Sequence, residues 1–451
     1  MPKREICLLN DSFPPIIDGV ANTVVNYGKN LTAMGDGVSV ITPDVPGAKD
    51  EGYPYPVIRY PSVDARKLTG YTVGIPLVGH VMEGLGERKV ELFHAHCPVS
   101  SLLMARGLRE KMDAPIVMTY HTKFDRDIAD GVSSKVLQEG AIKALVANVR
   151  AADEVWVVSE GAGENLRGLG YEGDYVVMEN GVDVPKGRLS EDRTRELTQG
   201  HDIPEGVPVF LFVGRMMWYK GQRIIIDALS ALKYAGYDFR MMFIGKGLEM
   251  EEIKAYAKEK NLERECIFTG PIYDREVLTA WYCRADLFLF PSTYDTNGLV
   301  VREAAACSLG SVLVRGSCAA EGVTDGKNGL FIEEDATSLA ICLTWMLEHR
   351  ERFRPLGEAA ADDLYISWET AVKRAAERYE IVIDNYKSGV YDSAMTPSDE
   401  LFKMEVALLD WRQKVREKFH SVTERGQELA DRGVNKLMEY GRDISDGING
   451  R

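Results

Sequence analysis

The stretch VFLFVGRMMWYKGQ (209–222) decides the fold, together with FRMMFIG (239–245) further along the chain. The uninterrupted run of Val, Phe and Leu before Gly214 is typical of a strand whose two faces are both buried in a parallel sheet. Residues 221–235, between the two apolar runs, are predicted to form a helix. Strand, loop, helix and strand in this order predict a βαβ unit and hence a parallel sheet.

The same alternation continues on both sides of this stretch. Toward the C-terminus we predict a helix at 249–260 and strands at 266–270 and 286–292. Toward the N-terminus the predicted elements are strands at 6–9, 38–42, 90–96, 116–121 and 154–159 and helices at 23–34, 100–112 and 133–150. The chain is therefore an α/β protein with two successive open sheets, in which ligands bind beyond the carboxyl ends of the strands.

These elements predict two doubly wound, Rossmann-like domains that face each other across a ligand cleft. We place the first domain at 1–185, a polar, helix-breaking linker at 186–207, and the second domain at 208–366. Residues 388–451 are predicted to be a helical extension, because Leu408, Val415, Val422 and Leu429 recur every seven residues. Two interpretations of this amphipathic extension stay open: packing on the body or in an oligomer interface, and binding to a membrane surface.

Composition excludes several classes of protein. Of the 451 residues, 45% are apolar and 27% are charged, as in a globular protein with proper cores. The net charge of −15 argues against a broad nucleic-acid surface. Seven scattered cysteines without a C-x-x-C pair fit a reducing cytoplasm. We find neither a secretory signal nor an apolar run of the roughly 18 residues that a spanning helix needs, and so expect a cytoplasmic protein.

The strongest functional motif is FPSTYDTNGLVVREAAA (290–306), in which a strand leads through a polar loop into a helix. Asp295 lies in the loop and Glu303 lies about one turn into the helix, so both acids are candidates for binding sugar hydroxyls. The amides of Asn297, Gly298 and Leu299 are at the helix start, where the free N–H groups and the helix dipole favour an anion such as phosphate. The alternative is a capped helix entry with a solvated aspartate.

A second motif is the loop after the strand at 209–214. Arg215 and Lys220 flank this loop, and two cations at a strand end can neutralise a diphosphate. The alternative is an ordinary pair of surface charges.

Two weaker candidates lie in the first domain. Gly19, in PPIIDGV (14–20), would let the backbone approach a ligand closely. His121 comes at the end of a predicted strand, where functional groups collect in this architecture. His94 and His96 form an HxH pair, but we predict no metal site because no third ligand has the required spacing.

Together these motifs resemble those of glycosyltransferase family 4, a family of retaining enzymes with the GT-B fold. They occur in the family's order over about residues 4–386, and are PPIIDGV, TYHT (119–122), VSE (158–160), NGVD (180–183), VGR…KG, FIGKG (243–247), FTGPI (268–272) and the acid-x7-acid loop. The segment SWETAVKRAAERYE (367–380) resembles the family's closing helix, which implies that residues 367–387 cross back to the first domain.

The resemblance implies a nucleoside-diphosphate sugar donor held mainly by the second domain. Arg215 and Lys220 would contact the diphosphate, and Glu303 would bind the ribose. The amides near Asn297–Leu299 would touch phosphate and sugar.

Further positions follow from the same resemblance. Ile272 would lie near the base, Gly19 would pass close to the phosphates, and His121 would contact the donor sugar. The chain departs from the family at Asp295, where a glutamate is usual, and the shorter side chain alters the contact with the donor sugar.

We therefore expect a retaining hexosyltransferase that uses a UDP-sugar, glucose being the expected hexose, and needs no metal or other cofactor. His121, Asp295, Arg215 and Lys220 are the expected catalytic residues. A membrane glycolipid or diacylglycerol is the expected acceptor, met through the aromatic and basic segment 59–76 at the inner face of the membrane. The acidic first domain argues against an anionic lipid surface, so a soluble or polymer-linked sugar stays open. So do a sugar-nucleotide epimerase and a catalytically silent nucleotide-sugar-binding subunit.

Overall fold

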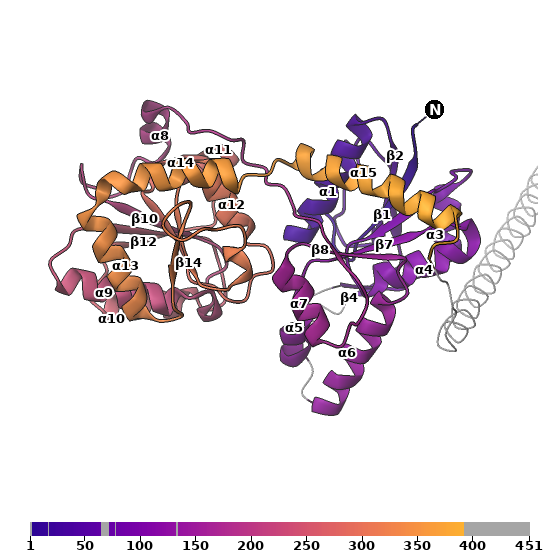
Figure 1. The fold of residues 1–451 in the computed structure, drawn as a ribbon, viewed down its shortest axis with the longest axis horizontal. Helices are drawn as coiled ribbons and strands as arrows, with labels where there is room; N and C mark the ends of the chain where they lie inside the picture. Colours follow the sequence, from indigo (N-terminus) through magenta and orange to yellow (C-terminus); the bar gives the residue numbers. More distant parts are fainter. Residues whose placement is uncertain (1, 17, 65–71, 77, 132–133, 392–451) are drawn as a thin grey trace, which may run out of the picture.

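The computed structural model describes residues 2–16, 18–64, 72–76, 78–131 and 134–391. Two α/β domains lie next to each other, and the chain crosses between them twice, once after the first sheet and once before the last helix (Figure 1). The fold prediction is confirmed: each domain is built on one parallel sheet with helices around it. Most of the predicted helical extension lies outside the described residues.

The sheet of the first domain has seven parallel strands in the order β3-β2-β1-β6-β7-β8-β9. The strands are β1 (Glu5–Leu9), β2 (Gly37–Pro43), β3 (Val57–Tyr60), β6 (Leu92–Ala95), β7 (Ile116–Tyr120), β8 (Glu154–Val157) and β9 (Val176–Val177). The helices are α1 (Gly19–Ala33), α3 (Val78–Leu85), α4 (Ser100–Met112), α5 (Phe124–Gly131), α6 (Lys135–Val149) and α7 (Glu160–Gly168). A separate antiparallel hairpin is formed by β4 (Ser62–Asp64) and β5 (Thr72–Gly74).

Both faces of this sheet are buried, as the apolar strands predict. Ile6 and Leu8 of β1 pack in one core cluster, whereas Cys7 and Leu9 pack in another. Successive side chains of a strand point to opposite faces, so a strand between two helical layers has to be apolar throughout.

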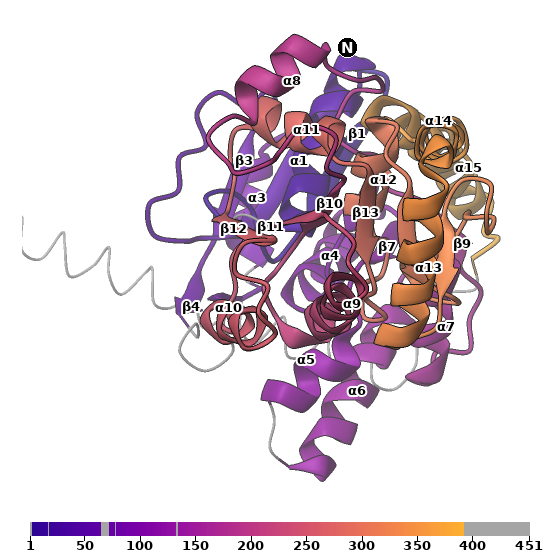
Figure 2. The same cartoon turned by 90° about the vertical axis from the view of Figure 1, so that its left-hand side faces the viewer.

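The sheet of the second domain has six parallel strands in the order β12-β11-β10-β13-β14-β15. The strands are β10 (Val209–Val213), β11 (Arg240–Ile244), β12 (Cys266–Gly270), β13 (Leu287–Phe290), β14 (Ser311–Val314) and β15 (Leu330–Ile332). The helices are α9 (Gln222–Tyr234), α10 (Met250–Glu259), α11 (Arg275–Arg284), α12 (Leu299–Ala306), α13 (Ala336–Glu348) and α14 (Phe353–Asp363). Short 3₁₀ turns are η1 (Trp218–Lys220), η2 (Cys318–Ala320) and η3 (Arg350–Arg352). Figure 2 shows this domain in front of the first one.

One expectation about the connection between the domains is wrong. The polar stretch 186–207, expected to break helices, contains α8 (Glu191–Leu197). Ser190 caps this helix by accepting a hydrogen bond from the Arg193 amide, and two acidic residues occupy its first turn. The Arg193 side chain pairs with Glu276 of α11, which anchors α8 on the second domain.

The last described helix, α15 (Trp368–Lys387), packs on the first domain although it follows the second one in sequence. Its apolar face, including Val372 and Tyr379, is buried in the same cluster as Ile6 and Leu8 of β1. Gly181 lies directly against the start of α15, since a Cβ atom there would be 2.4 Å from the Trp368 amide nitrogen. The two crossings of the chain between the domains therefore run side by side.

Candidate active site

The loop after β10 is held against the end of β13. Gly221 ends η1 with φ 87°, and a Cβ atom at this position would lie 2.4 Å from the carbonyl oxygen of Pro291. A positive φ and so close a contact both require glycine here. The close packing brings Lys220, at the end of η1, to the loop after β13 that carries Asp295.

Lys220 and Asp295 form a partly buried ion pair. The Lys220 Nζ donates to Asp295 Oδ1 at 2.7 Å, and the Ser292 hydroxyl donates to Asp295 Oδ2 at 2.6 Å. Burial lowers the pKa of Lys220, Asp295 raises it, and the nearby cations Arg215 and Lys123 lower it further. Arg215 itself is exposed. Two further cations, Arg215 and Lys123, thus act on the Lys220 ammonium, and this positive charge beside a single carboxylate suits an anionic ligand.

The start of α12 lies beside this group. Gly298 precedes the helix with φ 59°, and Leu299 is its first residue. The first-turn amides of a helix have no intrahelical acceptors, which makes this end favourable for a phosphate. The Asn297 side chain serves the protein itself: its Nδ2 donates to the Val158 carbonyl at 3.1 Å, and its Oδ1 accepts from Arg302 at 3.2 Å.

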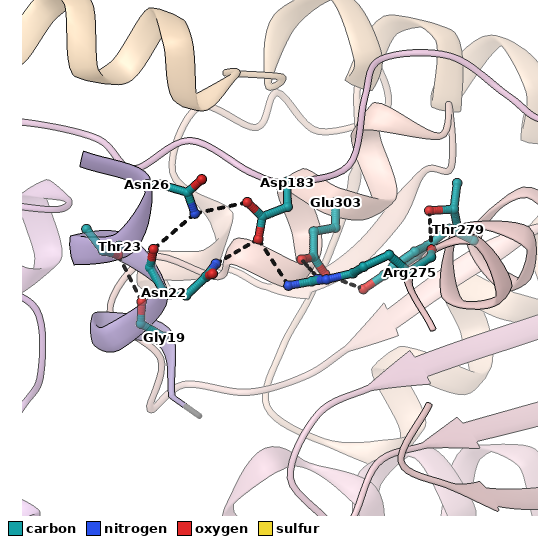
Figure 3. Close-up of polar contacts among 9 residues, drawn as sticks. Gly19, Asn22, Thr23, Asn26, Asp183, Arg275, Thr279 and Glu303 are labelled. Atoms are coloured by element: carbon teal, nitrogen blue, oxygen red, sulfur yellow. Dashed lines mark hydrogen bonds and ion pairs between the residues drawn. The ribbon is translucent and has the colours of Figure 1, made fainter. Parts of the chain in front are cut away.

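Glu303 lies one turn into α12, with its side chain 13% exposed. Its Oε2 accepts a hydrogen bond from the Tyr282 hydroxyl at 2.9 Å, and its Oε1 lies 3.5 Å from a guanidinium nitrogen of Arg275 (Figure 3). Burial raises the pKa of Glu303, whereas Tyr282 and Arg275 lower it. Ile272 follows β12 and is packed against the core of the same domain.

Gly19 begins α1 and is exposed. Asp18 caps the helix by accepting from the Ala21 amide at 2.7 Å. A Cβ atom at Gly19 would meet no other atom within 4 Å. Contacts within the protein therefore do not require glycine at this position, and the space in front of it is open to a ligand.

His121 follows β7 and is buried. Its Nε2 lies 3.0 Å from Nδ1 of His96, so one of the two rings donates a hydrogen bond to the other. Burial lowers the pKa of His121 to about 3, and the imidazole is therefore neutral near pH 7. His94 is engaged elsewhere, through the Tyr379 hydroxyl at 2.5 Å and the Thr119 hydroxyl at 2.6 Å.

Residues after β7 and β8 of the first domain contact the loop after β13 of the second. The Thr296 hydroxyl donates to the His121 carbonyl at 2.6 Å, and the Ser159 hydroxyl donates to the Thr296 carbonyl. The Lys123 Nζ donates to the Thr293 carbonyl at 3.3 Å. The structure thus brings His121, from one domain, next to the loop that carries Asp295 in the other.

Sequence reasoning missed three polar residues of this region. Lys123 adds a third cation, and its signal was its place two residues after His121 at a strand end. Arg275 and Asp183 connect Glu303 to α1 (Figure 3). Asp183 belonged to the NGVD motif, but nothing in the local pattern of Arg275 marked it.

Two further properties concern metals and membranes. In the ranges that the structure describes, no group of three or more His, Cys, Asp or Glu side chains is arranged to hold a metal ion. Among the helices of those ranges, none combines the length and the apolar character of a membrane-spanning helix. The segment 59–76 is described only in part, and its hairpin exposes Val63 and Val73.

Comparison with known proteins identifies the class. A model of glycosyltransferase family 4 matches residues 17–186, and a model of the glycosyl transferases group 1 matches residues 193–363. The first match lies in the first domain and the second match lies in the second domain. The chain therefore belongs to the glycosyltransferases that these two models describe. It is a hexosyltransferase with the GT-B fold, so the predicted family and enzyme class are confirmed.

Individual relatives agree with this assignment. The chain is 25% identical over 342 residues to an alpha-monoglucosyldiacylglycerol synthase of Acholeplasma laidlawii, a match that covers 73% of this chain and 85% of the relative. It is 28% identical over 400 residues to the sulfoquinovosyl transferase SQD2 of Arabidopsis thaliana, covering 85% of this chain and 74% of the relative. A solved structure of HepE from Anabaena in complex with UDP has the same fold, with a TM-score of 0.68, 20% identity, and coverage of 84% of this chain and 100% of that one.

Proposed function

We propose that this glycosyltransferase transfers a hexose, with glucose as the first choice, from a UDP-sugar to diacylglycerol or a membrane glycolipid, with retention at the anomeric carbon. The observation that carries the donor proposal is the group of cations Arg215, Lys220 and Lys123 beside the start of α12. Positive charge and free amides at one point suit a diphosphate that gains charge as the glycosidic bond breaks.

The proposed roles follow from this arrangement. Lys220, Arg215 and the amides of 297–299 hold the diphosphate, Glu303 accepts the ribose hydroxyls, and Gly19 lets the first domain approach the phosphates. The acceptor hydroxyl forms a bond to the anomeric carbon as the bond to the diphosphate breaks, and its proton passes to the departing phosphate. No metal is required, because the cationic side chains supply the positive charge.

Asp295 and His121 contact the hexose in this proposal. The Asp295 carboxylate is held by Lys220 and Ser292, so it is an oriented acceptor for a sugar hydroxyl and not a free nucleophile. Neutral His121 offers a hydrogen bond without adding charge beside the reacting carbon.

The lipid acceptor is supported by two observations. Two relatives are named for lipid or sulfoquinovosyl transfer. In the first domain, Val63 and Val73 of the β4–β5 hairpin and Val136 and Leu137 at the start of α6 are exposed. Exposed apolar side chains of this kind insert readily into a membrane interface at the inner face of the membrane.

A soluble or polymer-linked saccharide is the second candidate acceptor. The net charge of −15 supports it, since anionic lipid surfaces attract clustered Lys and Arg and repel an acidic protein.

Product analysis tests both candidates. The full chain is incubated with UDP-glucose, UDP-galactose or GDP-mannose and with vesicles that contain diacylglycerol, vesicles that contain glucosyldiacylglycerol, or soluble disaccharides. We expect a mass increase of one hexose on a lipid with UDP-glucose, and an α-anomeric proton coupling in the purified product. A β-linked product would contradict retention, and labelling of the disaccharides alone would favour the second candidate. Lys220→Ala, with its strongly reduced turnover, serves as the low-activity control.

A further inference from the structure

Arg275 joins two carboxylates that belong to different parts of the chain. It is the first residue of α11, and its side chain is 56% exposed. One guanidinium nitrogen donates to Asp183 Oδ2 at 3.0 Å, and the other lies 3.5 Å from Glu303 Oε1 (Figure 3). A planar guanidinium can address two carboxylates at once, which the point charge of a lysine does not do.

The connection continues into the first domain. Asp183 Oδ2 also accepts from Asn22 Nδ2 at 2.7 Å, and Asp183 Oδ1 accepts from Asn26 Nδ2 at 3.0 Å. Asn22 and Asn26 are one turn apart on the same face of α1, the helix that Gly19 begins. One unbroken series of polar contacts therefore leads from Glu303 in the second domain to α1 in the first (Figure 3).

Both ends of this series lie at positions assigned to the donor. An ionised carboxylate can accept a hydrogen bond on each oxygen, as two ribose hydroxyls require, whereas a protonated one uses one oxygen as a donor. Glu303 is buried, which disfavours its charged form, and Arg275 opposes this effect. At the other end, the exposed Gly19 offers open space for phosphates.

We propose that Arg275 is a positioning residue that orients Glu303 toward the ribose and, through Asp183, couples occupation of the ribose site to the position of α1. A bound nucleotide then draws Gly19 toward its phosphates. The inference rests on the proposed function in so far as the ligand is a nucleoside diphosphate, but not on the base, since UDP, GDP and ADP all carry the same ribose.

Calorimetric titration of the full chain with UDP, GDP and ADP tests the first part of the proposal, that Arg275 orients Glu303 for nucleotide binding. We expect Arg275→Ala to weaken binding about tenfold or more, equal to about 1.4 kcal/mol, and Arg275→Lys to weaken it less. The matched control is Arg193→Ala, which removes an exposed arginine–carboxylate pair from the neighbouring residue of α11, Glu276. The control should bind like the wild type.

A double-mutant cycle with Asp183→Ala tests the link between the two carboxylates. Because Asp183 acts through Arg275, the double variant should bind nucleotide no more weakly than Arg275→Ala alone. Losses that multiply would mean that the two residues act independently, and the coupling would be refuted.

Hydrogen exchange of α1 gives a readout that a purely structural role would not change. At saturating nucleotide, residues 22–33 should gain protection in the wild type but not in Arg275→Ala, whereas the start of α12 should gain protection in both. Equal protection of α1 in both proteins would overturn the inference.

The two levels of the hypothesis fail in different ways. If the wild type binds none of the three nucleotides, the proposed function fails and this inference fails with it. If the wild type binds nucleotide and both Arg275 variants bind it equally well, only the inference fails. Thermal unfolding of each variant verifies the fold, and Arg275→Lys retains the charge at an exposed position.

Discussion

The two domains present different chemistry at the carboxyl ends of their sheets. The second domain presents charged side chains, with Lys220 paired to Asp295 and Glu303 held by Arg275. The first domain presents mostly neutral groups: buried His121 and His96, and main-chain carbonyls that accept hydrogen bonds from the facing loop, with Lys123 as its one cation in the group around Lys220. Under the proposed function, the second domain supplies most of the charge that holds an anionic donor, and the first domain adds Lys123 and neutral groups beside the sugar.

The domains also differ in how they are completed. The core of the second domain is one large cluster built from consecutive elements, with a small separate cluster of Ala305, Ala360 and Leu364. The core of the first is divided into three clusters, and one of them includes α15 from the far end of the described chain. Because α15 supplies buried residues such as Tyr379, the first domain is complete only after the second has been synthesised.

The largest expected effect comes from weakening α15, the helix that completes the core of the first domain. Tyr379 is fully buried in α15, stacks on Trp156 at 5.4 Å and contacts His94. Tyr379→Ala should lower the free energy of unfolding of the first domain by about 3–5 kcal/mol, because it leaves a cavity and an unpaired ring nitrogen. Tyr379→Phe should cost less, about 1–3 kcal/mol, because it leaves no cavity but still leaves the His94 ring nitrogen without its partner. Denaturant unfolding followed by hydrogen exchange separates the domains, and an equal loss in both would contradict the picture.

The next effect concerns the charged side of the comparison. Lys220→Ala should reduce turnover about 10- to 100-fold while the protein stays folded, since a charged hydrogen bond contributes about 1.5–3 kcal/mol. Steady-state kinetics measures this. Lys254→Ala is the matched control, because it removes only a surface pair with Glu251. Normal kinetics in Lys220→Ala would sink the diphosphate assignment.

Substitution of Asp295 distinguishes contacts with the donor sugar from contacts with the donor nucleotide. Asp295→Ala should lower turnover clearly but leave UDP affinity within about threefold, because an interaction with the hexose appears in the rate and not in the binding of a sugarless fragment. Kinetics together with calorimetry measures the two quantities. Wild-type turnover in this variant would make Asp295 a loop residue whose role is to hold Lys220.

Lowering the pH should reduce the stability of the first domain, because its buried histidines are neutral in the folded protein. Burial lowers the pKa of His121 to about 3 and also lowers the pKa of His94 and His96, whereas an unfolded histidine titrates near 6.5. Between about pH 6 and pH 4 the unfolded state therefore binds more protons, and stability falls as the pH falls. His121→Asn should reduce this slope by about 1.4 kcal/mol per pH unit. An unchanged slope in urea titrations would show that His121 is protonated in the folded protein.

Removal of divalent metal ions is expected to have no effect. Excess chelator should leave the rate of sugar transfer unchanged, since cationic side chains are proposed to replace a metal at the diphosphate. Activity that is lost with chelator and restored by a divalent ion would overturn that part of the mechanism. Magnesium-saturated chelator is the control for non-specific effects.

Much of the architecture followed from local pattern. The uninterrupted apolar runs at 209–213 and 241–244 belong to strands covered on both faces, and the segment between them contains α9. Helix α1 begins earlier than predicted, at Gly19, because the Asp18 cap at the loop end was not recognised. Helix α8 was missed because a seven-residue polar helix has no apolar stripe from which it could be predicted.

The sequence by itself determined the two parallel sheets, the order of the motifs and the placement of Lys220, Glu303 and His121 after strands or at a helix start. These features depend on residue spacing within one element, which the chain carries locally. Only the tertiary structure decided the partners: Asp295 for Lys220, His96 for His121, and Arg275 with Asp183 for Glu303. Each of these pairs joins elements that are distant in sequence and meet through packing of the sheets and domains, and no local pattern specifies which side chains then come within hydrogen-bonding distance.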